Sequence, residues 1–292
     1  MNISHHQFCQ IDQLVRKVMK GMLTVEQFQQ QVLMIPVQWP LDLSPQYEYG
    51  QSILIINAAF YFVLNQGLNP SQPAYFQVVH DYILNHGKGI FKKDAEYQRG
   101  EIKNQNSLQT YLKKLLNHYA RLLFVRIDFA IKKEYQHEIA LNQFQAYLQV
   151  MSNRYSNQDG CFSGLQGHAW AIEEGLDKGL HCHTLLIYDG NKHQNDFGLG
   201  LQISDYWTEL TQGKGCCFIS NAPEYKQQFE QQGTLGIGMI HRTNSQQVQN
   251  ALNTAMYLVN PKKELQHLRI RLPRMRTFGT GQFAIQKRRG ID

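Results

Sequence analysis

The chain has 292 residues, of which 42% are apolar, so it can bury a sizeable core as one large domain or two ordinary ones. Its formal charge of +6 at pH 7 and pI near 9.0 are modest averages, and no uninterrupted apolar run approaches the length that spans a bilayer. These values exclude an integral membrane protein and predict a chain that is ordered nearly throughout.

The cysteines give a second indication of the protein class. The five cysteines form no CxxC pair and leave an odd number, which argues against a disulfide framework or a zinc ribbon. The start of the chain lacks the apolar core of a signal peptide. Both features indicate a reducing compartment, so we expect a soluble cytoplasmic protein.

Residues 1–115 are predicted to form a mainly helical N-terminal region. Apolar residues recur at helical spacing, and Thr24 and Ser107 are of the type that caps a helix N-terminus. The expected helices cover 11–19, 24–32, 52–64 and 107–119. Glycines interrupt the helical pattern between the last two of these helices. No residue of the region carries recognisable chemistry, so we assign it no role.

The spacing of the apolar residues changes in residues 116–292, the predicted second domain. Leu122–Phe129 is rich in β-branched and aromatic residues and indicates a buried strand. The elements expected after it are a helix at 137–151, two hairpin strands within 164–189, a short helix near 205–210, a strand at 235–241 and a helix at 246–259. The order βαββαβα predicts an α+β fold, in which an antiparallel sheet has helices packed on a face.

The centre of the hairpin carries two histidines two positions apart. Because successive residues of a strand point to opposite faces, His181 and His183 project from the same side. Gly175–Gly179 supplies the glycines of the turn, and the strand before it places a carboxylate across from the histidines. Two imidazoles and one carboxylate leave positions open on a divalent ion, as a catalytic metal site does. The alternative is a His-x-His sequence on a half-exposed strand that binds no metal.

The last predicted helix places one tyrosine away from its apolar stripe. The stripe that we expect to be buried consists of Val248, Leu252, Met256 and Val259. Tyr257 falls on a polar face, which it shares with Asn250, Asn253 and Asn260. We therefore predict that Tyr257 is presented at the surface, and the alternative is an ordinary tyrosine at the boundary of the core.

A basic segment follows this helix. Between Pro261 and Gly290 there are nine Lys or Arg residues and one acidic residue, Glu264. Such an excess is typical of a protein that binds a polyanion. The alternative is a solvated basic tail without a partner.

Four short motifs follow one another between about residues 121 and 282. They are Trp170-x-x-Glu173, His181-Cys182-His183 with an aliphatic run to Ile187, Tyr257-Leu258, and Arg276-x-Phe278-Gly279. In this order they resemble the motifs of the HUH endonuclease superfamily. The closer resemblance is to the replication proteins of filamentous phages (inovirus gene-II-like) and their YagK/YfjJ-type chromosomal relatives. Each motif alone is weak evidence, and four in order are fairly specific.

The resemblance implies an HUH/Rep-type sheet in residues 116–292 and a metal-dependent endonuclease that nicks DNA and rejoins it. His181, His183 and Glu173 would hold Mg²⁺ or Mn²⁺. The W-x-x-E spacing of the family selects Glu173 over its neighbour Glu174. Tyr257 would attack the scissile phosphate and form a phosphotyrosine link to the DNA.

One position departs from the family pattern. The family commonly has a lysine three residues after the tyrosine, where this chain has Asn260. Lys262 and Lys263 lie just beyond and take that catalytic role in our prediction. We assign phosphate contacts to these two lysines and to the four arginines that follow, which are Arg269, Arg271, Arg274 and Arg276.

We predict a rolling-circle replication initiator of a phage or prophage, a single-tyrosine enzyme in the cytoplasm of a bacterial host. Its substrate would be single-stranded DNA at a replication origin, with the host replication helicase and polymerase as candidate partners and no membrane. Three alternatives stay open. They are a transposase or relaxase of the same superfamily, a catalytically impaired DNA-binding relative, and an unrelated metallohydrolase that does not use Tyr257.

Overall fold

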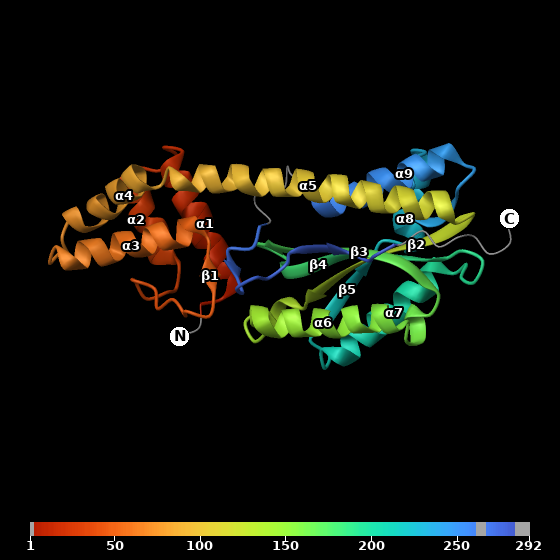
Figure 1. Ribbon diagram of the computed structural model, residues 1–292. Helices are drawn as coiled ribbons and strands as arrows, with labels where there is room; N and C mark the ends of the chain where they lie inside the picture. The colour runs from red at the N-terminus through yellow and green to blue at the C-terminus, as the bar shows by residue number, and fades with distance from the viewer. Residues whose placement is uncertain (1–2, 261–266, 284–292) are drawn as a thin grey trace.

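The computed structural model describes residues 3–260 and 267–283 (Figure 1). The α-helices are α1 (His5–Met19), α2 (Val25–Met34), α3 (Gln51–Asn65), α4 (Ala74–His86), α5 (Gly89–His118), α6 (Leu141–Asn157), α7 (Asp196–Leu210), α8 (Pro223–Gln231) and α9 (Ser245–Met256). Three short 3₁₀ segments are η1 (Lys133–Tyr135), η2 (Gly160–Phe162) and η3 (Tyr257–Val259).

The strands are β1 (Glu48–Tyr49), β2 (Arg121–Ile131), β3 (Leu165–Gly175), β4 (Gly179–Asp189), β5 (Gly215–Ile219), β6 (Gly238–His241), β7 (Ile270–Arg271) and β8 (Phe278–Thr280). Six of them form one sheet in the order β5-β2-β4-β3-β8, with β6 also paired to β2. All of its pairings are antiparallel. The other two, β1 and β7, form a small antiparallel pair.

Helices cover both faces of the large sheet (Figure 1). Helices α5 and α9 lie along one face, and α6 and α7 lie along the other. Helices α1–α4 gather at the N-terminal end of α5, and α1 contacts β3 and β4 at one end of the sheet. This arrangement confirms the predicted α+β fold with an antiparallel sheet and a mainly helical N-terminal region.

The two faces of the sheet follow from strand alternation. Even-numbered residues of β2, such as Phe124, point toward α5 and α9, and odd-numbered ones, such as Phe129, pack against α7 through Trp207. In β4 the parity is reversed, because Leu185 belongs to the α5 cluster and Leu186 to the other. Polar side chains at even positions of β2 and at odd positions of β4 therefore lie on the same face, the one that α5 and α9 cover.

Helix α2 begins where its predicted cap, Thr24, places it. The Thr24 side chain accepts a hydrogen bond from the Gln27 backbone, and the Gln27 side chain returns one, which forms a capping box. Helices α2 and α3 confirm the segments expected at 24–32 and 52–64.

The start expected at Ser107 is wrong, because α5 runs unbroken for 30 residues from Gly89. Its buried residues are Ile90 and then a group from Leu108 to Leu116, with none between them. The middle of α5 therefore has no apolar periodicity by which sequence could recognise it. The helix continues through the predicted boundary at residue 115 and joins the N-terminal cluster to the sheet (Figure 1).

Other differences concern elements with weak patterns. Helix α6 begins at Leu141 and not at 137, and α7 begins at Asp196, where the Asn195 side chain caps it by accepting from the Gly198 backbone. Strand β5 and helix α8 were not expected. None of the α8 residues is buried, so this helix has no apolar stripe, and β5 is only five residues long.

The predictions about membrane spans and disulfides can be compared with the structure. No helix in residues 3–260 and 267–283 has the length and apolarity needed to cross a bilayer. All five cysteines are free, as the odd number and the absence of CxxC predicted.

Candidate metal centre

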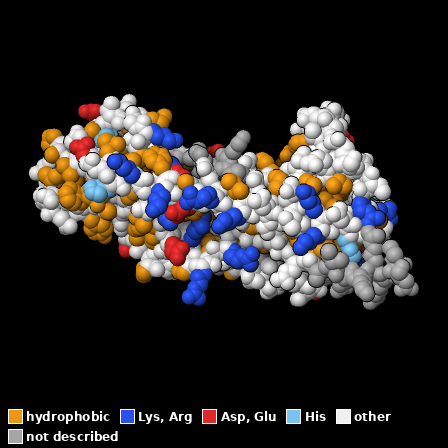
Figure 2. Space-filling model, turned by 45° about the horizontal axis from the view of Figure 1, so that its top comes forward, with side chains coloured by type: hydrophobic (Ala, Val, Ile, Leu, Met, Phe, Trp, Pro, Cys, Tyr) orange, Lys and Arg blue, Asp and Glu red, His pale blue; other side chains and the backbone are white. Residues whose placement is uncertain are grey.

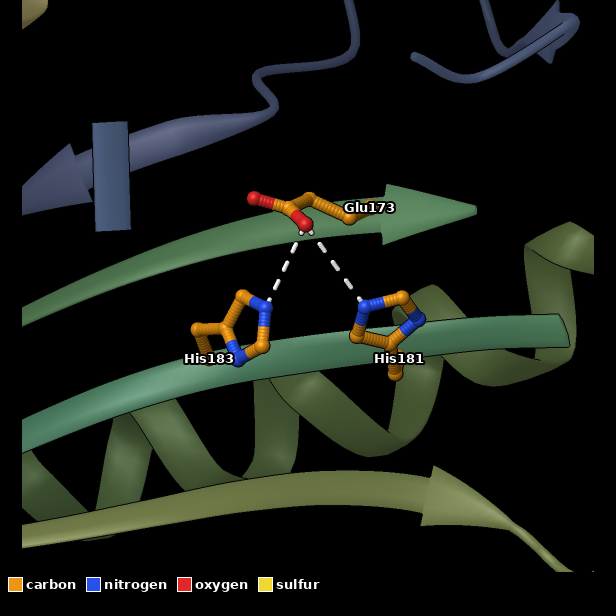
Figure 3. Close-up of side chains that lie close together, drawn as sticks. All are labelled: Glu173, His181 and His183. Atoms are coloured by element: carbon orange, nitrogen blue, oxygen red, sulfur yellow. Dashed lines mark ion pairs between the residues drawn. The ribbon is translucent and has the colours of Figure 1, made fainter. Parts of the chain in front are cut away.

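The hairpin of β3 and β4 places a carboxylate next to two imidazoles. Glu173 lies directly across the ladder from His181. Figure 3 shows both histidines of β4 pointing toward Glu173. The Glu173 Oε2 atom lies 3.2 Å from His183 Nε2 and 3.6 Å from His181 Nε2. All three residues are buried, and their candidate ligand atoms lie within 4.8 Å of one another. The group could hold a metal ion.

The far nitrogen of each imidazole has its own partner. His183 Nδ1 lies 2.8 Å from Asp128 Oδ2, and His181 Nδ1 lies 3.0 Å from the Gly179 carbonyl oxygen. A proton on each Nδ1, donated to these acceptors, would leave the Nε2 lone pair available to a metal ion on the side of Glu173. A metal-binding histidine usually donates a hydrogen bond from its other ring N–H to a carboxylate or a backbone carbonyl. The donor set therefore fits a divalent ion.

Strand β2 adds two charged residues to the same face. Asp128 pairs with His183 across the ladder, and Arg126 Nη2 lies 3.4 Å from Asp128 Oδ1 and 3.2 Å from His183 Nδ1. Burial opposes ionisation of Asp128, but the hydrogen bond from His183 and the charge of Arg126 outweigh it and lower the Asp128 pKa. Asp128 is thus a carboxylate that orients His183.

Sequence reasoning missed Arg126 and Asp128. The signal was present, because two charged residues stand two positions apart in an otherwise apolar strand and so share a face. Charged side chains are rarely buried unless they are paired, so this spacing in a buried strand indicates a polar site.

Tyr257 lies over this face of the sheet. Helix α9 ends at Met256, and Tyr257 begins the 3₁₀ segment η3, whose next two residues are buried. The ring centroid of Tyr257 lies 6.0 Å from that of His183, and the guanidinium carbon of Arg126 lies 5.1 Å from the Tyr257 centroid. The tyrosine is 52% exposed, which confirms the prediction that it is presented.

The chain matches a known protein family over the segment that contains this site. A model of the YagK/YfjJ C-terminal domain matches residues 86–281. The chain belongs to the YagK/YfjJ C-terminal domain family. The match begins at the end of α4 and includes α5, the whole sheet and every residue of the candidate metal centre. No curated protein and no solved structure matches the chain.

Three other tyrosines of the YagK/YfjJ domain, Tyr155, Tyr188 and Tyr206, do not belong to the candidate metal centre. Tyr155 and Tyr188 lie near the C-terminal ends of α6 and β4, and Tyr206 lies in α7. Tyr155 and Tyr188 are buried on the α6 side of the sheet. Burial raises the pKa of both phenols well above the ordinary value. Neither is suited to attack a phosphate at the metal centre.

The polar face predicted for α9 is partly wrong. Asn253 is exposed, but Asn250 is buried and its amide donates to the Gly233 and Leu235 carbonyls. Asn250 therefore fixes the loop before β6 and does not share the surface of Tyr257. Asn260 lines a groove together with Glu173.

The phosphate contact predicted for Arg269 is wrong. It is only 5% exposed, its Nε lies 3.2 Å from Asp12 Oδ2, and its Nη1 donates to the Glu174 carbonyl at 3.0 Å. A guanidinium held in this way cannot reach a phosphate at the surface. Arg269 instead joins the sheet to α1 of the N-terminal cluster.

The other predicted basic residues lie in different surroundings. The Arg271 guanidinium stacks on Tyr97, with 4.8 Å from its carbon to the ring centroid. Arg274 and Arg276 are exposed. Lys262 and Lys263, to which a catalytic role was assigned, lie outside the described residues.

Two of the sequence motifs meet in the YagK/YfjJ domain. Gly279 of β8 pairs with Trp170 of β3, and a Cβ atom at Gly279 would lie 2.7 Å from the indole. Only glycine leaves room for the indole at this position. Trp170 points to the face opposite Glu173. Its contact with Gly279 therefore fixes the edge of the sheet without touching the candidate metal ligands on the other face.

Comparing Glu173→Gln with Glu174→Gln tests which of the two neighbouring glutamates is the metal ligand. Glu174 is fully buried on the opposite face, where its carboxylate accepts from the Arg269 backbone at 2.8 Å and lies 2.6 Å from His5 Nδ1. We expect Glu173→Gln to weaken Mn²⁺ binding at least about 100-fold. We expect Glu174→Gln to keep that affinity but to lower the free energy of unfolding by about 1–3 kcal/mol.

Calorimetric titration with Mn²⁺ and urea unfolding measure these two effects. A larger loss of Mn²⁺ affinity in Glu174→Gln than in Glu173→Gln would reverse the assignment of the ligand.

Proposed function

We propose that the chain is a rolling-circle replication initiator, a site-specific endonuclease and ligase of single-stranded DNA with an HUH-type site. The observation that carries the proposal is the exposed phenol of Tyr257 beside the buried pair His181 and His183 with Glu173. An attacking group next to a candidate metal centre is the arrangement that phosphoryl transfer through a covalent intermediate requires. The order of motifs adds the resemblance to phage replication proteins.

The metal proposed for the centre is Mg²⁺ or Mn²⁺, held by His181, His183 and Glu173. When bound, such an ion polarises the phosphate and stabilises the charge that develops on it. Asp128 keeps His183 in the tautomer that offers Nε2, and the Gly179 carbonyl does the same for His181. Imidazole ligands favour Mn²⁺ in solution, whereas cellular abundance favours Mg²⁺.

Tyr257 forms the covalent bond in this proposal. Its phenolic oxygen attacks phosphorus, the bond from phosphorus to the 3′ oxygen breaks, and a 5′-phosphotyrosyl link results. The proton lost by the phenol is balanced by the proton that the departing 3′ oxygen gains as it becomes a hydroxyl. One phosphodiester replaces another, so a later 3′ hydroxyl can reverse the step and rejoin the strand without a nucleotide cofactor.

Arg126 positions the attacking ring. Its guanidinium lies against Tyr257 and also contacts Asp128 and His183. A cation–π contact contributes about 0.5–2 kcal/mol, enough to favour one orientation of an exposed ring. Arg126 thereby connects Tyr257 of η3 to His183 of β4. It places a cation beside the tyrosine in a chain that has Asn260 where the family commonly has a lysine.

Exposed cations support a polyanionic substrate. Figure 2 shows Lys and Arg side chains along the face that α5 lines. The exposed basic residues of α5 are Lys92, Lys93, Arg99, Lys103, Lys113 and Lys114. Such contacts to phosphates are independent of base sequence and sensitive to salt.

Neutralising Arg274 and Arg276 together should weaken binding of single-stranded DNA. Both are exposed arginines of the segment that leads to β8. We expect the slope of log affinity against log salt to flatten by about 0.7 for each phosphate that the variant no longer neutralises. Fluorescence anisotropy across a salt series measures it. The matched control is the pair Lys17→Gln and Lys20→Gln in the N-terminal cluster. An unchanged slope in the arginine variant would place the DNA elsewhere.

Trapping a covalent adduct tests the proposed function. The full chain is incubated with Mn²⁺ and origin-containing single strands, and the protein is then examined under denaturing conditions for bound DNA. A stable adduct supports nicking and joining. Cleavage without an adduct favours a metallohydrolase, and binding without cleavage favours the impaired relative that Asn260 allows. An origin-like or a terminal-hairpin substrate separates an initiator from a transposase or relaxase.

A further inference from the structure

A cavity lies on the face of the sheet opposite the metal centre. It is enclosed by α6, by β3 and β4, and by the segment that leads into β8, and its volume is about 380 Å³. Cavities of about 300–1,000 Å³ are typical of sites for small ligands. The cavity is therefore large enough for one nucleotide.

The cavity wall combines rings with uncharged polar groups. Tyr155, His168 and Trp170 supply rings, and Thr184 and Gln145 supply a hydroxyl and an amide. Burial lowers the pKa of His168, so its ring is neutral and can donate at one nitrogen and accept at the other. None of the described residues that line the cavity is acidic. Flat walls with uncharged donors and acceptors suit a nucleobase.

Two arginines also line the cavity. Arg274 and Arg276 belong to it, and both are exposed, so their guanidinium groups lie where the cavity meets solvent. A guanidinium presents paired donors that match the oxygens of a phosphate. The combination of an uncharged interior and two cations at the opening matches a base that carries a phosphate.

The same segment also borders the metal centre. Thr277 and Phe278 line the groove that contains Glu173, on the other side of the sheet edge. The Ile172 backbone donates to the Thr277 carbonyl at 2.8 Å, so the segment is fixed to β3 immediately beside Glu173. A flexible strand that leaves the groove can cross this edge past Arg276 and enter the cavity.

We propose that the cavity binds one nucleotide of the single-stranded DNA, with its base inside and its phosphate on Arg274 and Arg276. The inference rests on the proposed function, because it takes the substrate from there. It adds a site that selects which base occupies a position next to the scissile phosphate. The site is separate from the metal ligands and acts in binding before any bond is broken.

Filling the cavity from α6 tests the inference. Ser152 lines the cavity and is half-buried, whereas Ser156 lies one turn further along the helix, is exposed and does not line it. We expect Ser152→Phe to bind origin-containing single strands about 10- to 100-fold more weakly, the loss of one stacked base. Ser156→Phe should bind like the wild type. Anisotropy in EDTA measures binding without cleavage, and circular dichroism checks both folds.

A second variant keeps the test independent of the folding of the first. Gln149 is exposed and lines the same wall, so Gln149→Trp should weaken binding in the same way. Oligonucleotides with one base changed at a time should show a base preference in the wild type that both filled variants lose.

Three outcomes overturn the inference. Equal DNA affinities in Ser152→Phe, Gln149→Trp and Ser156→Phe would show that no base enters the cavity. A deoxynucleoside monophosphate that binds the cavity as tightly as the oligonucleotide would assign it to a free nucleotide. Wild-type protein that binds no single-stranded DNA would remove the ligand altogether. The first of these outcomes contradicts the cavity alone, whereas no adduct in the wild type contradicts the proposed function.

Discussion

Tyr257→Phe is expected to eliminate the covalent adduct between protein and DNA and to lower cleavage at least about 1,000-fold. The substitution removes one oxygen atom and leaves the ring contacts with Arg126 and His183 in place. The side chain is 52% exposed, so no buried cavity results that could explain a loss of activity through instability. Affinity for single-stranded DNA should stay at the wild-type value.

Peptide mapping of the adduct provides the measurement. In the wild type we expect a phosphotyrosyl peptide that contains Met256-Tyr257-Leu258. The control is Tyr61→Phe, because Tyr61 is 51% exposed and lies in α3, outside the segment that matches the family. An adduct on another tyrosine would move the active site. Cleavage that persists in Tyr257→Phe would replace covalent catalysis with attack by water.

His181→Ala is expected to abolish both metal-dependent cleavage and the stabilisation of the fold by Mn²⁺. In the wild type, Mn²⁺ at 100 times its dissociation constant should stabilise the folded state by about 2.7 kcal/mol. Two ligands, His183 and Glu173, remain in the variant, and a divalent ion held by fewer protein groups is bound more weakly. Thermal unfolding with and without Mn²⁺ measures the effect independently of any reaction.

Because His181 is buried, the His181→Ala variant needs a control for the stability of the fold. His181 is only 2% exposed, so it belongs to the buried part of the sheet. Its loss leaves a cavity, so the unfolding temperature without metal must be compared first. His241→Ala, which alters an exposed histidine of β6, is the control. Full cleavage by the wild type in EDTA, or an undiminished Mn²⁺ shift in His181→Ala, would contradict the metal centre.

Local sequence determined the hairpin and the ligands that it presents. The period of two in a strand puts His181 and His183 on one face, and the glycines of Gly175–Gly179 set the turn. That turn fixes the register, so Glu173 faces the histidines and Glu174 faces away. The shared face of the histidines and the hairpin depend on residues close together in the chain, so they could be predicted without the tertiary structure. The choice of Glu173 over Glu174 came from the W-x-x-E spacing of the family resemblance.

Tertiary structure alone decided which distant residues join the centre. Asp128 and Arg126 reach His183 because β2 pairs with β4 in one register, and Tyr257 reaches it because α9 packs on the same face. Arg269 looked like a surface cation but is neutralised by Asp12, which lies far away in sequence. The cavity under α6 likewise forms only where that helix meets the sheet edge. Such contacts are fixed by the packing of whole elements against one another. They cannot be predicted from the spacing of residues within a single element.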